Sequence, residues 1–159
     1  MNKENLIRKI LEKLGKEIVE LEESASSAHE ASVEAPGAMQ SHSDTSKFQN
    51  KVSEGNIGTM IQQKKIQSEA IKNVALPERA SDINLGVCVL VEDSGIEKRY
   101  IVLPGGSGIE AWDDETLDSY MSITPDTPIG KALLGKKEGE KTSFKIGQKE
   151  KKLLIKKIW

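Results

Sequence analysis

A seven-residue repeat of apolar side chains near the start of the chain restricts its fold more than any other feature. Between residues 3 and 31 the apolar positions follow one another at steps of four and three, at Ile7, Leu11, Leu14, Ile18, Leu21, Ala25 and Ala28. This spacing is typical of a helix that packs along another helix, as in a coiled coil. About 29 residues at 1.5 Å each would form a rod of roughly 44 Å. The seam narrows from leucine to alanine, so we expect a slender distal end.

Two further patterns support this helix. Leu6 and Ile10 widen the apolar seam at its start. Lys13–Glu17 and Lys16–Glu20 are oppositely charged pairs four residues apart, and such pairs stabilise a helix when they face each other on its surface.

A break and a second helical stretch follow. Pro36-Gly37 lies among small polar residues over 32–44, a composition typical of a turn. The stretch from about 45 to 74 has a helical pattern, although Gly55 and Gly58 weaken it by about 1 kcal/mol each relative to alanine. Two helices of similar length around a short break predict an antiparallel coiled-coil hairpin over residues 1–75, with its tip around 32–44. Each helix alone would be marginal, so the shared seam must stabilise both.

The pattern changes from helices to strands after residues 76–83, which we interpret as a linker. The segments expected to form strands are 87–91, 97–103, 120–124, 142–146 and 152–159. The glycine-rich segment Pro104–Gly108 lacks the Lys-Ser/Thr ending and the following helix of a phosphate-binding loop, so we interpret it as a plain loop. The sequence therefore predicts an α+β protein, in which a helical hairpin precedes a small antiparallel β domain over 84–159.

Charge is segregated along the chain, although its formal net charge is only −2. Residues 82–130 carry 2 basic and 10 acidic side chains, whereas residues 131–159 carry 10 basic and 3 acidic ones. These lysines alternate with apolar residues, and Phe144 is the one aromatic side chain between the first and the last of them. We therefore favour a solvated or protein-binding face over a groove for nucleic acid.

The sequence also indicates a compartment. It has no apolar run long enough for a membrane span and no signal peptide. The single cysteine, Cys88, excludes an intramolecular disulfide and lies between valines, as a buried small hydrophobic residue does. We expect a cytoplasmic protein.

Residue sets that commonly carry catalysis are scarce. His29 and His42 have no spacing that indicates zinc, and two histidines do not complete a Ser-His-Asp set here. The acidic group Asp113, Asp114, Glu115 and Asp118 could bind a divalent cation, but consecutive carboxylates in a loop are more often solvated. We therefore expect no enzyme active site of its own.

A short capped helix is predicted between two of the strands, within Ile123–Glu140. Asp126 or Thr127 can accept hydrogen bonds from the first-turn amides, and Pro128 suits the first helical position. Gly135 is expected to end the helix. Lys136 and Lys137 follow it, where cations interact favourably with the negative end of the helix dipole.

This stretch resembles the C-terminal signature of the Gre-type transcription elongation factors. The resemblance rests on Thr124-Pro125-x-Thr127-Pro128-Ile129-Gly130-Lys131-Ala132-Leu133-Leu134-Gly135-Lys136-Lys137-x-Gly139-Glu140. It implies an FKBP-like C-terminal domain and RNA polymerase as partner, with nucleic acid contacted only indirectly through the elongation complex and no membrane. We expect a monomer, although the seam of the first helix could instead pair with a second copy, since coiled coils also form dimers. The signature residues that it implies for polymerase docking are Thr124, Pro125, Thr127, Pro128, Gly130, Lys131, Leu133, Gly135, Lys136 and Gly139.

The resemblance also implies a function for the tip of the hairpin. In Gre-type factors the hairpin enters the secondary channel of the polymerase, where acidic tip residues help to hold a catalytic Mg²⁺ of the polymerase and promote cleavage of backtracked transcripts. Asp44 matches one of these acids and Phe48 the aromatic position, whereas Ser41 and Lys47 occupy positions that are acidic in the cleavage factors. Glu34, before the turn, is a possible substitute. The protein would need no cofactor of its own.

The role of Asp44 and the function of the protein both have alternative interpretations. Asp44 could assist the metal, or it could only cap the second helix. The protein could be a polymerase secondary-channel regulator that lacks cleavage stimulation, since Ser41 and Lys47 replace acids. An FKBP-type prolyl isomerase is disfavoured because residues 84–159 offer few aromatic side chains for its pocket.

Overall fold

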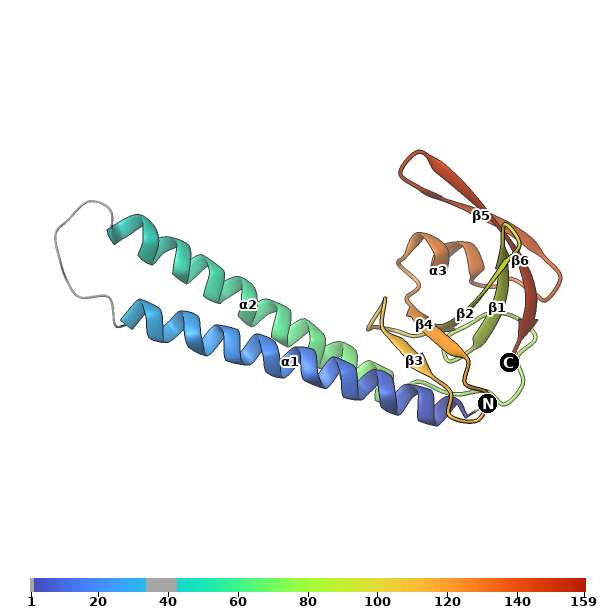
Figure 1. Cartoon of the computed structure of the whole chain (residues 1–159), viewed down its shortest axis with the longest axis horizontal. Helices are drawn as coiled ribbons and strands as arrows, with labels where there is room; N and C mark the ends of the chain where they lie inside the picture. Colours follow the sequence, from blue (N-terminus) through green and yellow to red (C-terminus); the bar gives the residue numbers. More distant parts are fainter. Residues whose placement is uncertain (1, 34–42) are drawn as a thin grey trace.

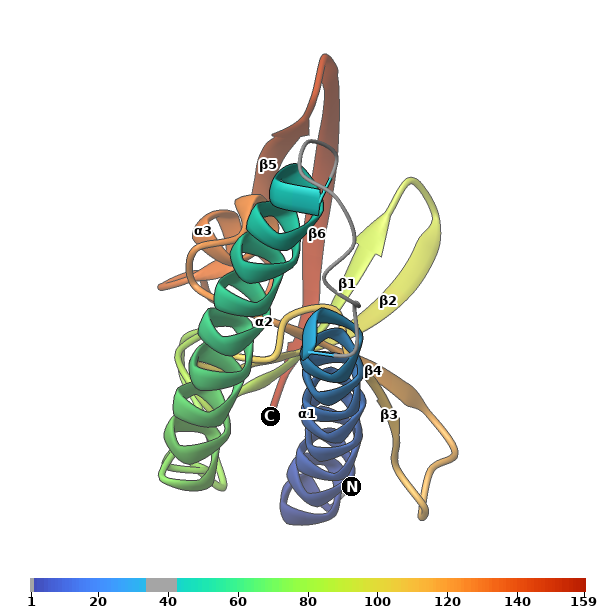
Figure 2. The ribbon, with the colours of Figure 1, turned by 90° about the vertical axis from the view of Figure 1, so that its left-hand side faces the viewer.

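The computed structural model describes residues 2–33 and 43–159. Its elements are α1 (Lys3–Val33), α2 (Ser43–Lys72), β1 (Cys88–Asp93), β2 (Ile96–Val102), β3 (Glu110–Trp112), β4 (Ser119–Ile123), α3 (Pro128–Leu133), β5 (Lys141–Ile146) and β6 (Lys149–Ile158). The helices α1 and α2 lie side by side and project as a rod from the sheet (Figure 1). Figure 2 looks along that rod toward the sheet. The predicted α+β class, a helical hairpin followed by a sheet domain with one short helix, is confirmed.

The six strands form one sheet in the order β3-β4-β2-β1-β6-β5. The pairing of β2 with β4 is parallel, from Tyr100 opposite Met121 to Val102 opposite Ile123. The expectation of a wholly antiparallel domain is therefore wrong in this one pair. The physical reason is β3, which pairs antiparallel with β4 at the sheet edge. The chain reverses into β3 and again into β4, so β4 runs parallel to β2.

The sheet is covered on both faces, because successive side chains of a strand point to opposite sides. On one face, α1 and α2 pack against Cys88, Ile101 and Tyr120. On the other, Leu133 of α3 packs with Val91 and other apolar residues of the sheet. This double coverage explains the nearly continuous apolar run in β1.

The start of α1 is buried more deeply than its heptad seam indicates. Leu6, Ile10 and Leu14 are fully buried, and Ile7 is 8% exposed. Leu6 and Ile10 were expected only to widen the seam. They are core residues because the first turns of α1 contact both α2 and the sheet, which buries two of its faces.

The charged residues of α1 also take different partners from those predicted. The Lys13 ammonium donates to the Glu110 carbonyl at 2.5 Å, so it bonds to the sheet edge and not to Glu17. Glu17 instead accepts from Lys64 of α2 at 2.6 Å, and Glu22 accepts from Lys65 at 2.7 Å. These contacts join the two helices across the seam.

Residues 76–83, between α2 and β1, are tied to both ends of the chain. The Lys3 ammonium donates to the carbonyls of Pro77, at 2.5 Å, and Trp159, at 2.7 Å. Burial lowers the pKa of Lys3 from its ordinary value. Leu76 packs in the core beneath the hairpin, and Ile83 is fully buried on the opposite face of the sheet. The base of the hairpin and the sheet therefore share packing through this segment.

None of the helices in residues 2–33 and 43–159 is long and apolar enough to cross a membrane.

Candidate functional site

The first candidate site is the distal end of the helical hairpin. Glu34 and Ser41 lie outside the described residues. Asp44, Lys47 and Phe48 belong to the first turns of α2, whose backbone is described and whose side chains here are not. Because α2 begins at Ser43, two residues before the predicted start, Asp44 lies inside the first turn. A carboxylate in a first turn is stabilised by the positive end of the helix dipole.

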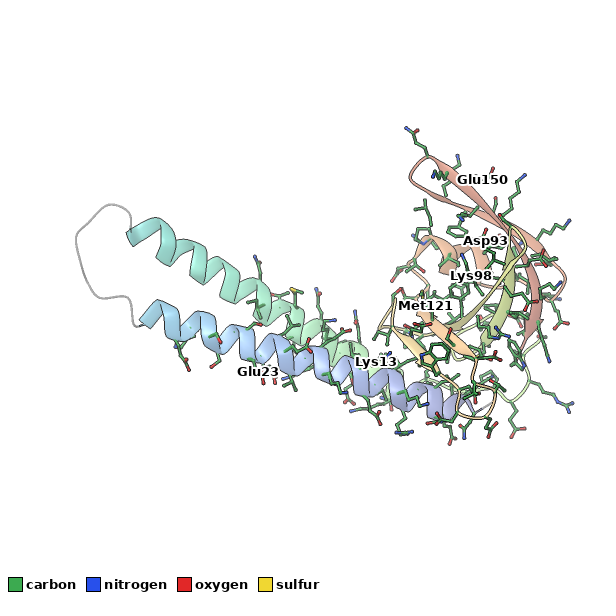
Figure 3. The ribbon with its side chains drawn as sticks, in the orientation of Figure 1. Lys13, Glu23, Asp93, Lys98, Met121 and Glu150 are labelled. Carbon is green, nitrogen blue, oxygen red and sulfur yellow. The ribbon has the colours of Figure 1, made fainter. Side chains whose placement is uncertain are left out.

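The hairpin carries this end far from the sheet domain. The 31 residues of α1 correspond to roughly 46 Å of helix. In Figure 3, Lys13 lies close to the sheet, whereas Glu23 lies farther out along α1. The ion pairs Glu17–Lys64 and Glu22–Lys65 join the two helices along the way. The arrangement is a rod held at one end.

The glycines of the Pro104–Gly108 loop have a packing role at the base of this rod. A Cβ atom on Gly105 would lie 2.6 Å from the Gln67 Cβ of α2, too close for any other residue type. The Gln67 side-chain oxygen accepts from the Gly106 amide at 3.4 Å. The loop therefore lets α2 approach the sheet closely, which agrees with the rejection of a phosphate-binding loop.

The second candidate site is the signature around α3, whose predicted cap is confirmed. The Thr127 hydroxyl accepts from the Gly130 amide at 3.1 Å and donates to the Thr124 carbonyl at 2.7 Å. Pro128 is the first helical residue, as predicted. A Cβ atom on Gly130 would lie 2.0 Å from the Thr124 carbonyl oxygen, so only glycine fits there.

The end of the signature ties α3 to two other segments. Gly135 adopts a φ of 71°, and its amide donates to the Ile83 carbonyl at 2.8 Å. The Lys136 carbonyl accepts from the Ile83 amide at 2.9 Å. The Gly139 amide then donates to the Ile155 carbonyl of β6 at 2.8 Å. Much of the signature thus serves to hold α3 between the 76–83 segment and β6.

Some of the signature residues face solvent. Leu133 is fully buried, whereas Lys131 and Pro128 are exposed. A partner that binds this motif can contact the exposed side chains directly, whereas Gly130 and Leu133 stabilise the fold around them. The docking role of the signature stays a prediction.

The acidic segment 113–118 has structural partners. Burial raises the pKa of the Asp113 carboxyl, but hydrogen bonds from the amides of Glu115, Asn2 and Thr116 outweigh it and hold that pKa below its ordinary value. Asp114 bonds to Lys9 and Asn5 of α1. Asp118 pairs with Arg99 at 3.1 Å. Among the described residues no group of three or more His, Cys, Asp or Glu side chains could hold a metal ion.

Asp93 is a buried charge at the end of β1. Its carboxylate is 6% exposed and pairs with Lys98 at 2.9 Å and Lys151 at 3.2 Å. Hydrogen bonds from these two lysines lower the pKa of Asp93. Because Lys151 lies two strands away from Lys98, the carboxylate joins the β1–β2 turn to β6. The sequence pattern that could have predicted these ion pairs is an acidic residue at a strand end with lysines on neighbouring strands.

The aromatic side chains of the sheet domain are divided between its two faces. Tyr120 packs edge-on against Trp159 beneath the hairpin, with ring centroids 6.3 Å apart. Burial raises the pKa of Tyr120 to about 12. Tyr100 and Phe144 belong to the core on the α3 side, and Trp112 is 52% exposed. These rings therefore do not line one common pocket.

Comparison with known families identifies the chain. The family model "Transcription elongation factor, GreA/GreB, C-term" matches residues 78–159, which is more than half of the chain. The chain belongs to the GreA/GreB family of transcription elongation factors. No curated protein sequence matches it.

Several solved structures are similar to the chain. A structure of the transcription factor Gfh1 is 22% identical over 93% of this chain and 92% of its own, with a TM-score of 0.39. GreA factor homolog 1 (Gfh1) of Thermus thermophilus is 21% identical over 94% of each chain, with a TM-score of 0.37. A GreA/GreB factor of Nitrosomonas europaea is 15% identical over 68% of this chain and 91% of its own, with a TM-score of 0.35.

Proposed function

We propose that the protein binds RNA polymerase, inserts the tip of its helical hairpin in the secondary channel, and promotes cleavage of backtracked transcripts. The observation that carries this proposal is the rod itself. It is buried against the sheet at its base and extends away from it, with Asp44 in the first turn of α2 at the far end (Figure 1). A free-standing rod of this kind is explained by a partner with a deep opening.

Asp44 is the residue that we propose to act at the tip. The chain supplies one carboxylate there at a position that matches the family pattern, and Mg²⁺ commonly takes one or two protein carboxylates and fills its other positions with water and substrate oxygens. The ion would be the polymerase's own Mg²⁺, which supplies the chemistry of phosphodiester cleavage. The protein would have no active site or cofactor of its own.

The proposed partner accounts for the other expected properties. RNA polymerase lies in the cytoplasm of bacteria, so the protein would act there, as a monomer. Under this proposal the tip reaches nucleic acid only inside the polymerase, through the elongation complex. The exposed signature residues Lys131 and Pro128 are the proposed docking contacts.

A transcript-cleavage assay on stalled elongation complexes tests this function. Asp44→Asn should leave folding nearly unchanged, since Asn and Asp suit helix starts equally well. Cleavage should fall by about tenfold or more, since even groups that only support a metal ligand commonly contribute 10–100-fold. Glu23→Gln is the matched control, because it removes one exposed carboxylate from α1 away from the tip (Figure 3). Equal cleavage by both variants would contradict the role of Asp44.

The second candidate is a secondary-channel regulator without cleavage stimulation, and the residues that favour it are Ser41 and Lys47. Lys47 places a cation where cleavage factors carry an acid. Ser41→Asp should raise cleavage, chiefly at high Mg²⁺, because two nearby carboxylates repel each other in the absence of a cation. If the wild type binds polymerase but stimulates no cleavage, and Asp44→Asn changes neither property, the regulator is the correct function.

The distribution of aromatic rings disfavours a prolyl isomerase. Such an enzyme needs several rings around one pocket, whereas Tyr120 and Tyr100 lie on opposite faces of the sheet. A peptidyl-prolyl turnover assay should therefore give no rate above background.

A further inference from the structure

The hairpin formed by β5 and β6 gathers lysines on one face. Ser143 lies opposite Lys152, Lys145 opposite Glu150, and Lys141 opposite Leu154. Directly opposite residues of an antiparallel pair project to the same side. Lys141, Ser143, Lys145 and Lys152 therefore share one face, here called the lysine face, whereas Thr142 and Leu153 point to the other side.

The lysine face borders a shallow groove of about 520 Å³. Its lining includes Lys141, Lys152, Ser143, Ser94 and Glu92, together with Leu153 and Leu154. Glu92 is compensated by Lys156, whose ammonium lies 3.2 Å from its carboxylate. Within residues 2–33 and 43–159, neither Lys141 nor Lys152 has a carboxylate at ion-pair distance. The groove thus presents two uncompensated cations beside two hydroxyl groups.

The position of the β5–β6 hairpin exposes the lysine face to solvent. Its far end, near Glu150, reaches beyond the other strands (Figures 1 and 3). Lys141, Ser143, Lys145 and Lys152 are all exposed. The surrounding segment 131–159 carries 10 basic and 3 acidic residues in a chain whose net charge is −2. The positive potential is therefore local and would attract a polyanion to this side of the molecule.

The chemistry of the groove distinguishes between two kinds of polyanion. Protein interfaces are enriched in aromatic residues, Met and Arg and depleted in Lys and Ser, whereas the lining of this groove has two lysines and two serines and no aromatic residue, Met or Arg. Lysine and serine are common partners of nucleic-acid phosphates. The lining also has no aromatic ring on which an unpaired base could stack. A two-stranded β ribbon is narrow enough for the major groove of a duplex.

We propose that the lysine face binds the phosphate backbone of double-stranded nucleic acid, without sequence preference. This contact is direct and made by the sheet domain, so it is separate from the contact of the hairpin tip within the polymerase. It also revises the interpretation from sequence, in which the alternation of lysines favoured a solvated or protein-binding face. The alternation places some of the lysines together on one side of a projecting ribbon.

Fluorescence anisotropy with a labelled 20-base-pair DNA duplex, the free full-length protein and a salt series tests this proposal. We expect weak binding at low salt, in the micromolar range typical of non-specific association. Lys141→Gln with Lys152→Gln should reduce affinity about tenfold or more. It should also reduce the salt slope by about two, because each lysine that no longer meets a phosphate lowers the slope by about one. Lys141→Arg with Lys152→Arg should retain binding, because the charge is retained.

Lys72→Gln with Lys137→Gln is the matched control, since it removes two exposed lysines from other parts of the surface. It should bind like the wild type. Equal weakening in both double variants would show only an effect of net charge and would overturn the proposal. Stronger binding of polyglutamate than of the duplex would also overturn the proposal, because it would indicate an acidic protein as the partner. Stronger binding of single-stranded oligothymidine than of the duplex would overturn it as well. Circular dichroism and thermal unfolding verify that each variant is folded.

Discussion

The two halves of the helical hairpin share a sequence pattern but differ in what surrounds them. At the base, Ile10 and Leu14 are fully buried between α2 and the sheet. Farther out, the seam residues Ile18 and Leu21 of α1 are only partly buried, and Met60 of α2 is 46% exposed. The base is a part of the sheet domain's core, whereas the outer half is held only by its partner helix. A heptad repeat therefore predicts that the two helices pair, but it does not predict which part of them also packs against the sheet.

The base of the rod therefore contributes stability, whereas the outer half serves to hold the tip away from the sheet. Burial at the base fixes the direction of the rod, and the outer half contributes length with little apolar surface. Most helical stability in proteins comes from packing of an apolar face. We therefore expect mutations to have large effects at the base and small effects farther out.

The largest effect is expected from truncation of the core at the base. Ile10→Ala removes a fully buried side chain and should lower the free energy of unfolding by about 2–5 kcal/mol. Val19→Ala in the same helix should cost about 0.5 kcal/mol or less, because the side chain is half exposed. Urea denaturation of both variants measures the contrast. Similar losses at the two positions would show that the two halves are equally supported.

A smaller effect is expected from the cap of α3. Thr127→Ala removes the hydroxyl that accepts from the Gly130 amide and should lower the free energy of unfolding by about 1 kcal/mol. Thr59→Ala is the matched control in the outer part of α2, where the hydroxyl bonds only to the Gly55 carbonyl one turn earlier. Such a back-bond slightly destabilises helices, so this change should be neutral or slightly stabilising. Thermal unfolding followed by circular dichroism resolves the two.

The buried carboxylate of Asp93 should give the sheet domain a dependence on acid. Its two lysine partners lower its pKa from the ordinary value of 3.8. The stability that it contributes is therefore complete above that value and is lost as pH falls through it toward the lower folded pKa. Asp93→Asn should be less stable than wild type at pH 7, with the difference shrinking near pH 3. Urea midpoints at both pH values measure this, and a constant difference would contradict it.

The smallest effect is expected from the ion pairs between the helices. A double-mutant cycle with Glu17→Gln and Lys64→Gln should give a coupling of about 0.2–1 kcal/mol, because both side chains are partly solvated. The more exposed pair Glu22–Lys65 should give less. A coupling well above 1 kcal/mol in the outer pair would mean that charge, not the sheet, holds the rod.

The parts of the fold that were predictable from sequence depend on contacts between near neighbours. The α3 cap at Thr127 and the glycine stop at Gly135 lie within a few residues of the groups they satisfy. The roles of Leu6 and Ile10 were underestimated because their partners on the sheet are about a hundred residues away. The strand β3 has three residues, too few for a visible alternation, and the parallel pairing of β2 with β4 was missed with it.

The candidate site divides in the same way. The sequence places Asp44 near the start of a helix and identifies the signature, both of which are local patterns. It did not show that Asp113 bonds to Asn2 or that Asp114 bonds to Asn5 of α1, since each contact closes a loop of more than a hundred residues. It also did not show which lysines of β5 and β6 share a face, because that depends on the register of the pair.

The burial of the first turns of α1 against the sheet also affects how the chain can fold during its synthesis. Leu6 and Ile10 belong to the same core as Cys88, Ile101 and Tyr120, so one face of α1 has no cover until the sheet exists. Synthesis proceeds at about 5–20 residues per second, so roughly 7 to 30 s separate the appearance of Leu14 from that of β6. In this interval α2 can shield one side of α1, while the side that will meet the sheet remains open to chaperones or to another nascent chain. Slower translation beyond residue 75 should therefore increase aggregation, and the substitution Ile10→Ser should reduce it at the expense of final stability.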